Sequence, residues 1–176
     1  MAKHQKRDML LRAAADIVNE RGVSALTLDA VAQRAEVSKG GLLYHFNNKQ
    51  ALIQGLVDHA NELYRENVRS YVDGDQQGKW LQAFIEATRK HRKENKAVTS
   101  AILAAQGNDR NLLAPLQATY QEWQDHIQAD GLDPVDATIY RLAVDGLWLS
   151  DIFGLTSIDD EMREAVLDRL KALSSK

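Results

Sequence analysis

"TLDAVAQRAEVSKGGLLYHF", residues 27–46, carries the clearest structural signal in this sequence. Thr27 and Ser38 each precede a short segment with helical spacing of apolar residues, and both residue types are preferred helix N-caps. The stretch therefore predicts two short helices, at residues 27–35 and 38–45, joined by a tight connection. A pair of this size, packed under a preceding amphipathic helix, has the dimensions of a helix-turn-helix.

The second of these helices contains two adjacent glycines, Gly40 and Gly41, directly after Lys39. Each glycine costs a helix interior about 1 kcal/mol relative to alanine. In a helix-turn-helix the second helix enters the DNA major groove with its N-terminal residues at the base edges. Glycines at this place lack side chains that would strike the groove wall. The pair therefore predicts close approach of backbone to DNA, with Lys39 reaching the bases.

Helical spacing extends over nearly the whole chain, which has only two prolines. We predict an all-α fold with two domains: an N-terminal three-helix helix-turn-helix DNA-binding domain at residues 1–48, and a C-terminal helical bundle for ligand binding and dimerisation at residues 49–176. The remaining helices are expected at residues 3–21, 49–71 (capped by Asn47 or Asn48), 79–93, 96–107, 111–130, 134–154 and 159–173.

The charge is distributed unevenly along the chain. Residues 1–50 carry 8 Lys and Arg against 5 Asp and Glu, whereas residues 51–176 carry 14 against 20. A basic segment on an acidic chain indicates that the first part binds a polyanion, although random scatter gives an alternative explanation.

Composition also narrows the class of protein. The chain has no cysteine, which excludes disulfides and thiolate metal sites. No apolar run approaches the length of a membrane span, so we expect a cytoplasmic protein without membrane association. The histidines and carboxylates form no spacing that catalysis or metal binding requires. We therefore expect no enzymatic activity, no cofactor and no metal.

Residues 27–53, "TLDAVAQRAEVSKGGLLYHFNNKQALI", resemble the DNA-binding segment of the TetR family of bacterial transcriptional regulators. The shared pattern has threonine opening the second helix, Val-Ser-x-Gly opening the third, aromatic-His-Phe closing it, and lysine beginning the fourth. The match covers most of residues 5–55. Beyond them the likeness consists of chain length and helical character.

The resemblance implies a role for each matching residue. Residues that would contact backbone phosphates are Thr27, Ser38, Tyr44, His45 and Lys49. Residues that would face base edges are Lys39, Gly40 and Gly41. The alternative interpretation is that Thr27 and Ser38 are caps only, that His45 shields the edge of the core, and that Lys39 is an ordinary solvated lysine.

Two residues depart from the family pattern. Glu36 stands where the turn usually has glycine, which predicts a turn that is either strained or differently shaped. Leu43 stands where a phosphate-binding tyrosine is common, and the aromatic residue has moved one place to Tyr44.

The expected helix at residues 134–154 is apolar nearly all round, which indicates burial on two sides. One side can pack on the protein's own core, and the other predicts a second copy of the chain. The resemblance also implies a homodimer through the last two helices. The expected interface residues are Ile139, Leu142, Gly146, Leu149, Phe153, Met162, Val166 and Leu170.

A pocket for an unidentified, mostly apolar small-molecule effector is expected between the long fourth helix and the helices at residues 79–130. Candidate lining residues, each of which could instead be core, are Trp80, Phe84, Ile102, Leu103, Tyr120, Trp123, Ile127 and Trp148. The predicted function is a dimeric, ligand-responsive repressor released from a palindromic double-stranded DNA operator by that effector. The alternative is a helical protein-binding adaptor without DNA binding.

Overall fold

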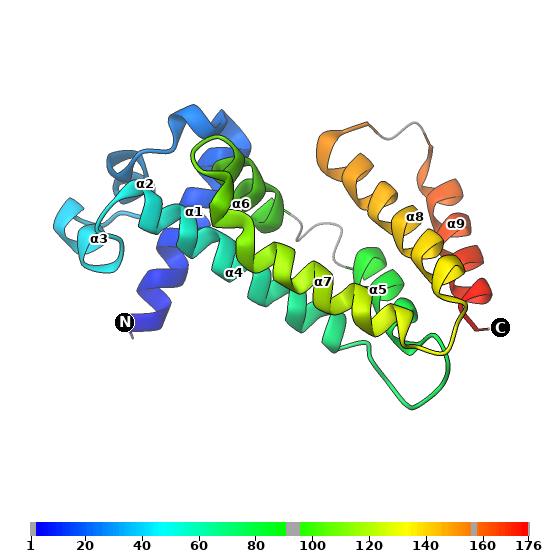
Figure 1. Ribbon diagram of the computed structural model, residues 1–176. Coiled ribbons are helices and arrows are strands. Elements are labelled where there is room, and N and C mark those ends of the chain that lie inside the picture. The colour runs from blue at the N-terminus through cyan, green and yellow to red at the C-terminus, as the bar shows by residue number, and fades with distance from the viewer. Residues whose placement is uncertain (1–2, 91–95, 156–157, 176) are drawn as a thin grey trace. The chain divides into compact units, whose positions relative to one another are not determined.

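The structure is a computed structural model that describes residues 3–90, 96–155 and 158–175. Within these ranges the chain folds into α-helices and two short 3₁₀ turns, with no strand, as the sequence predicts (Figure 1). The helices are α1 (Lys3–Arg21), α2 (Leu28–Arg34), α3 (Lys39–His45), α4 (Lys49–Arg69), α5 (Lys79–Lys90), α6 (Lys96–Gln106), α7 (Ala114–Gln128), α8 (Pro134–Phe153) and α9 (Asp160–Leu173), and the 3₁₀ turns are η1 (Val23–Ala25) and η2 (Arg110–Leu113).

Helix boundaries follow the local signals in the sequence. Asn48, rather than Asn47, caps α4, because its Oδ1 accepts a hydrogen bond from the backbone N–H of Ala51 at 2.7 Å. Asp133 caps α8 through the N–H groups of Val135 and Asp136. Gly154 ends α8 in the left-handed conformation that glycine adopts without strain. Residues 91–93, predicted to end the helix that begins at residue 79, lie outside the described residues.

The described residues form two compact units of packing. The first contains residues 3–63 and 96–117, so that α6 joins the helix-turn-helix. Its helix α1 packs against α2, η1 and α6. Fully buried side chains fill this unit: Leu10, Leu11, Ile17, Leu26, Val31, Leu42, Leu52 and Ile53.

The second unit contains residues 64–90, 118–155 and 158–175. In it α5 packs against both α8 and α9. The core cluster contains Val68, Leu81, Phe84, Ile85, Trp123, Ile127, Val144, Leu167 and Leu170. Asp130 caps α5 from a distant part of the chain, because its carboxylate accepts from the N–H of Trp80 at 2.7 Å.

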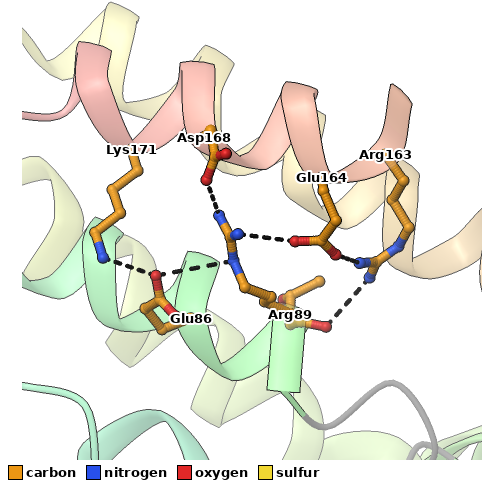
Figure 2. A network of polar contacts seen from close by, with 7 residues as sticks. Glu86, Arg89, Arg163, Glu164, Asp168 and Lys171 are labelled. Atoms are coloured by element: carbon orange, nitrogen blue, oxygen red, sulfur yellow. Dashed lines mark hydrogen bonds and ion pairs between the residues drawn. The ribbon is translucent and has the colours of Figure 1, made fainter. Parts of the chain in front are cut away.

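Charged side chains join α5 to α9 on one side of the second unit (Figure 2). Arg89 on α5 donates to Glu164 at 2.8 Å and to Asp168 at 2.7 Å. Lys171 on α9 pairs with Glu86 on α5. Arg163, only 2% exposed, pairs with the buried carboxylate of Asp151 and donates to the carbonyl of Thr88. Buried Arg163 therefore has partners for its charge, as its position in a low-dielectric interior requires.

The units of packing do not follow the predicted division at residue 48. Both α4 and α7 contribute residues to each unit, and α6 belongs with α1. Apolar spacing identifies a helix and its buried face but does not say which distant helix covers that face. The functional division between residues 1–48 and 49–176 remains a proposal.

Candidate nucleic-acid interface

The helix-turn-helix is built from two capped helices. The Thr27 hydroxyl oxygen accepts from the N–H of Ala30 at 3.1 Å at the start of α2, and Ser38 Oγ accepts from the N–H of Gly41 at 3.1 Å at the start of α3. Both caps are exposed. On the opposite side of α3, Leu42 is fully buried and fixes the helix on the core. The first turn of α3 is therefore an ordered, exposed helix N-terminus.

The turn between α2 and α3 places Glu36 in the left-handed region, with a φ of 53°. This is the conformation that glycine adopts most easily and that other residues adopt at a cost. The backbone N–H groups of Glu36 and Val37 still bond to the carbonyls of Gln33 and Ala32. Of the two predicted outcomes, the chain therefore keeps the tight turn and accepts the strain, with an exposed carboxylate on this surface.

The two glycines of α3 differ in the space around them. A Cβ atom added at Gly40 would meet no atom of the protein within 4 Å, and one added at Gly41 would lie 3.2 Å from Ser38 Oγ. Nothing in the protein's own packing thus requires glycine at residue 40. The requirement for glycine by a DNA partner, expected from the sequence, stays a prediction.

Lys39 has a partner that its place in the sequence does not indicate. Its Nζ lies 2.9 Å from Oδ1 and 3.1 Å from Oδ2 of Asp29, which stands in the first turn of α2. Both side chains are exposed, at 59% for Lys39 and 71% for Asp29. The ten-residue separation gives no local signal for the pair, since it depends on how α2 and α3 cross.

The other predicted contact residues lie on the same unit. Tyr44 is 73% exposed, and its ring meets that of His45 edge to face at a centroid distance of 5.2 Å. His45 and Lys49 are half-buried. Leu43, at the position where the family often has tyrosine, is 38% exposed. The exposed aromatic side chain at residue 44 therefore carries a hydroxyl that Leu43 lacks.

Contacts from α1 and α4 hold the helix-turn-helix in place. Arg34 at the end of α2 donates two hydrogen bonds to the Glu20 carboxylate on α1. Phe46, which follows α3, is buried and lies so close to Gly55 of α4 that an added Cβ would come within 2.6 Å of its ring. The guanidinium of Arg7 lies 5.5 Å from the centroid of the same ring.

The predicted effector-pocket residues fall into two groups. Ile102 and Leu103 lie on α6 in the first unit, and the other six lie in the second. Within the second unit Phe84, Trp123 and Ile127 belong to the core cluster, Trp148 is buried, and Trp80 and Tyr120 are half-buried.

Aromatic rings surround Tyr64 of α4 in the second unit. The Tyr120 ring stacks on Tyr64 at 5.8 Å, and the rings of Phe84 and Trp123 meet it edge to face. Trp80 stacks on His126 at 4.0 Å. Nearby on α8, Asp145 pairs with Arg141 at 2.8 Å, and burial raises the pKa of Asp145 to about 6 despite the opposing effect of Arg141. Burial likewise raises the pKa of Tyr64 well above its ordinary value.

The predicted interface residues of α8 are exposed. Ile139, Leu142, Leu149 and Phe153 form an apolar stripe with 44–54% of each side chain exposed, and Gly146 on the same stripe has no neighbour within 4 Å of an added Cβ. Met162 of α9 is also exposed. The prediction that Leu170 lies at the interface is wrong, because only 7% of this residue is exposed and it packs in the core of its own unit. Val166 is half-buried against the same core.

Among the described residues, no cluster of His, Asp or Glu has the geometry to hold a metal ion. In the same residues no helix combines the length and the apolar character needed to cross a membrane.

Comparison with known proteins gives matches at both ends of the chain. Residues 10–56 match the model described as bacterial regulatory proteins, tetR family, and residues 78–175 match that of a tetracyclin repressor-like C-terminal domain. The transcriptional regulator TtgR of Pseudomonas putida is 33% identical over 72 residues, which are 41% of this chain and 34% of that relative. This match thus spans about a third of the relative's length.

Solved structures resemble the chain over nearly all of it. A TetR-like regulator from Rhodococcus sp. RHA1 has a TM-score of 0.76 at 19% identity and covers 99% of this chain and 96% of its own, which shows the fold. The multidrug binding protein EbrR complexed with ethidium has a TM-score of 0.63 at 25% identity, covering 96% of this chain and 99% of its own.

The all-α fold and the capped, exposed α3 define a helix-turn-helix DNA-binding protein with a second helical unit. The two matched models together cover most of the sequence, and the second alone covers more than half. The chain belongs to the TetR family of transcriptional regulators.

Proposed function

We propose that this chain acts in the cytoplasm as a dimeric repressor and binds a palindromic operator through two copies of α3. The observation that carries the proposal is the exposed first turn of α3, where Gly40 leaves open space beside Lys39. Backbone can approach the floor of the major groove there, and a lysine amine can donate to guanine O6 and N7.

The phosphate contacts that we propose surround this turn. Thr27 and Ser38 stand at helix N-termini, where exposed N–H groups and the helix dipole favour an anion. Tyr44, His45 and Lys49 supply the remaining donors from α3 and the start of α4. Such contacts fix the protein on the duplex, whereas Lys39 and the glycines read the bases.

Dimerisation is proposed through the α8 stripe of Ile139, Leu142, Gly146, Leu149 and Phe153, together with Met162 of α9. A row of large apolar side chains exposed along one helix is unfavourable in water and is typical of a protein interface. A two-fold axis would present two copies of α3 to successive half-sites of an operator.

The proposed effector is a small, mostly apolar or aromatic molecule held in the second unit. The rings of Tyr64, Tyr120 and Trp123 offer stacking surfaces there. The likeness to EbrR, which binds ethidium, makes ethidium a reasonable first probe. Binding would release the operator by favouring a dimer in which the two copies of α3 are wrongly spaced. Titration of the full chain with ethidium without DNA, followed by fluorescence anisotropy, tests this part.

DNA recognition is tested by duplex binding at several salt concentrations. Phosphate neutralisation releases counterions, so the affinity should fall steeply as salt rises. An operator selected from random DNA then separates the two lysines. Lys39→Ala should reduce sequence preference, whereas Lys49→Ala should weaken all duplexes alike. Binding that does not depend on salt would contradict DNA recognition, and equal losses for both variants on both duplexes would show that Lys39 does not read bases.

A further inference from the structure

The first turns of α2 and α3 are joined by one exposed ion pair. Both carboxylate oxygens of Asp29 lie within 3.1 Å of the Lys39 amine. Arg34, the single cation of α2, is held by Glu20 and Asp16 of α1. Asp29 therefore pairs with Lys39, the lysine on the proposed DNA-binding surface.

A carboxylate at this place has opposite consequences for the two kinds of acceptor on DNA. Phosphates are anionic, so any phosphate that Lys39 approaches also approaches Asp29, and repulsion offsets much of the attraction. Guanine O6 and N7 carry no net charge and can share the amine with Asp29 at little electrostatic cost. Pairing with Asp29 therefore weakens the attraction of Lys39 to DNA phosphates more than its attraction to the base edges.

We propose that Asp29 is a specificity-determining residue, which holds the Lys39 amine and thereby suppresses sequence-independent binding to DNA. The inference rests on the proposed function, because it assumes that α3 enters the groove. It assigns to Asp29 a role that its place in the first turn of α2 does not require. An acidic residue there also interacts favourably with the helix dipole, but this interaction does not need the contact with Lys39.

The test compares full-length wild type, Asp29→Asn, Lys39→Met and the double variant on two duplexes. One duplex is the operator selected by the wild type, and the other is random sequence. Asp29→Asn should bind random DNA roughly 3- to 10-fold more tightly, with a salt slope steeper by about 0.9, because Lys39 then neutralises a phosphate. Affinity for the operator should rise less, so the ratio of specific to random binding falls.

Two comparisons show whether Asp29 acts through the lysine. In the Lys39→Met background, Asp29→Asn should no longer change that ratio. Asp136→Asn removes the same charge from an exposed first-turn position of α8 and should leave the ratio unchanged. Thermal unfolding of each variant confirms that the fold is retained.

Equal gains on both duplexes, or an undiminished effect of Asp29→Asn without the lysine, would overturn the inference while leaving DNA recognition intact. A wild-type chain that binds neither duplex in a salt-dependent way would instead overturn the proposed function, and the inference with it.

Discussion

At Gly40 we expect a larger side chain to change folding stability and operator binding in opposite directions. An added Cβ meets no protein atom there, so Gly40→Ala should stabilise the fold by about 0.5 kcal/mol through reduced backbone entropy of the unfolded chain. The same methyl group should collide with the groove wall and weaken operator binding roughly 5- to 100-fold. Urea unfolding and operator titration measure the two effects. Gln33→Ala, on the exposed face of α2, is the control. Unchanged operator affinity in Gly40→Ala would contradict the proposal that this glycine allows the backbone to approach DNA closely.

Glu36 carries strain that a single substitution can relieve. Its φ of 53° is unfavourable for a residue with a Cβ, by roughly 1–2 kcal/mol. Glu36→Gly should therefore stabilise the protein by about 0.5–1 kcal/mol in urea unfolding, even after the entropy that glycine adds to the unfolded chain. Gln33→Gly in the preceding helix should destabilise by a similar amount. A loss of stability in both variants would show that the turn tolerates Glu36 without strain.

Much of the candidate site could be predicted residue by residue, because a helix N-cap bonds to N–H groups only a few residues further along the chain. Thr27 and Ser38 accept the hydrogen bonds that their positions predict. Gly40 lies beside open space, but the close approach of DNA that its helix cost suggests stays a prediction. The Asp29 to Lys39 pair could not be predicted, since it depends on the crossing of two helices rather than on spacing within one.

At the scale of elements, α8 contains a part-buried ion pair, and the protonation of its carboxylate can be measured. Burial raises the pKa of Asp145 to about 6, and Arg141 opposes that rise. An unfolded aspartate has a pKa near 3.9, so the folded chain holds this proton more tightly. Ionisation of Asp145 therefore lowers the free energy of unfolding as the pH rises from about 4 to about 6, and the loss is complete above that range.

Arg141→Met should raise the pKa of Asp145 above 6, because the substitution removes the cation that favours the carboxylate. Carboxyl ¹³C chemical shifts followed through a pH titration measure it, with the signal assigned by its loss in Asp145→Asn. Lys171→Met removes a cation that pairs with Glu86 instead and should leave the midpoint unchanged. A midpoint near 4 in the wild type would show that Asp145 is solvated.

The elements themselves were predictable, whereas their partners were not. Apolar spacing correctly placed α8 and α9, but it could not say which apolar face meets the protein's own core. Leu170 therefore looked like an interface residue and is core. Similarly, the spacing within α6 does not indicate that this helix packs against α1, which places it in the first unit.

For the whole molecule, the apolar stripe on α8 gives the decisive test of assembly. Gly146 lies in the middle of the stripe, and its side-chain position is open within one protomer. Glutamate is accommodated there in water, so Gly146→Glu should leave each protomer folded. In a dimer the same carboxylate would be buried against apolar side chains without a partner, which costs several kcal/mol.

Gly146→Glu should therefore yield a folded monomer by light scattering, with a helical circular dichroism spectrum like that of the wild type. Operator affinity should fall roughly 100-fold or more, because the second half-site no longer benefits from the effective concentration that a dimer provides. Gln128→Glu adds the same charge at an exposed site on α7 and should leave the dimer intact. If Gly146→Glu remains dimeric, the α8 stripe is not the interface. A monomer with undiminished operator affinity would instead show that one copy of α3 suffices for recognition.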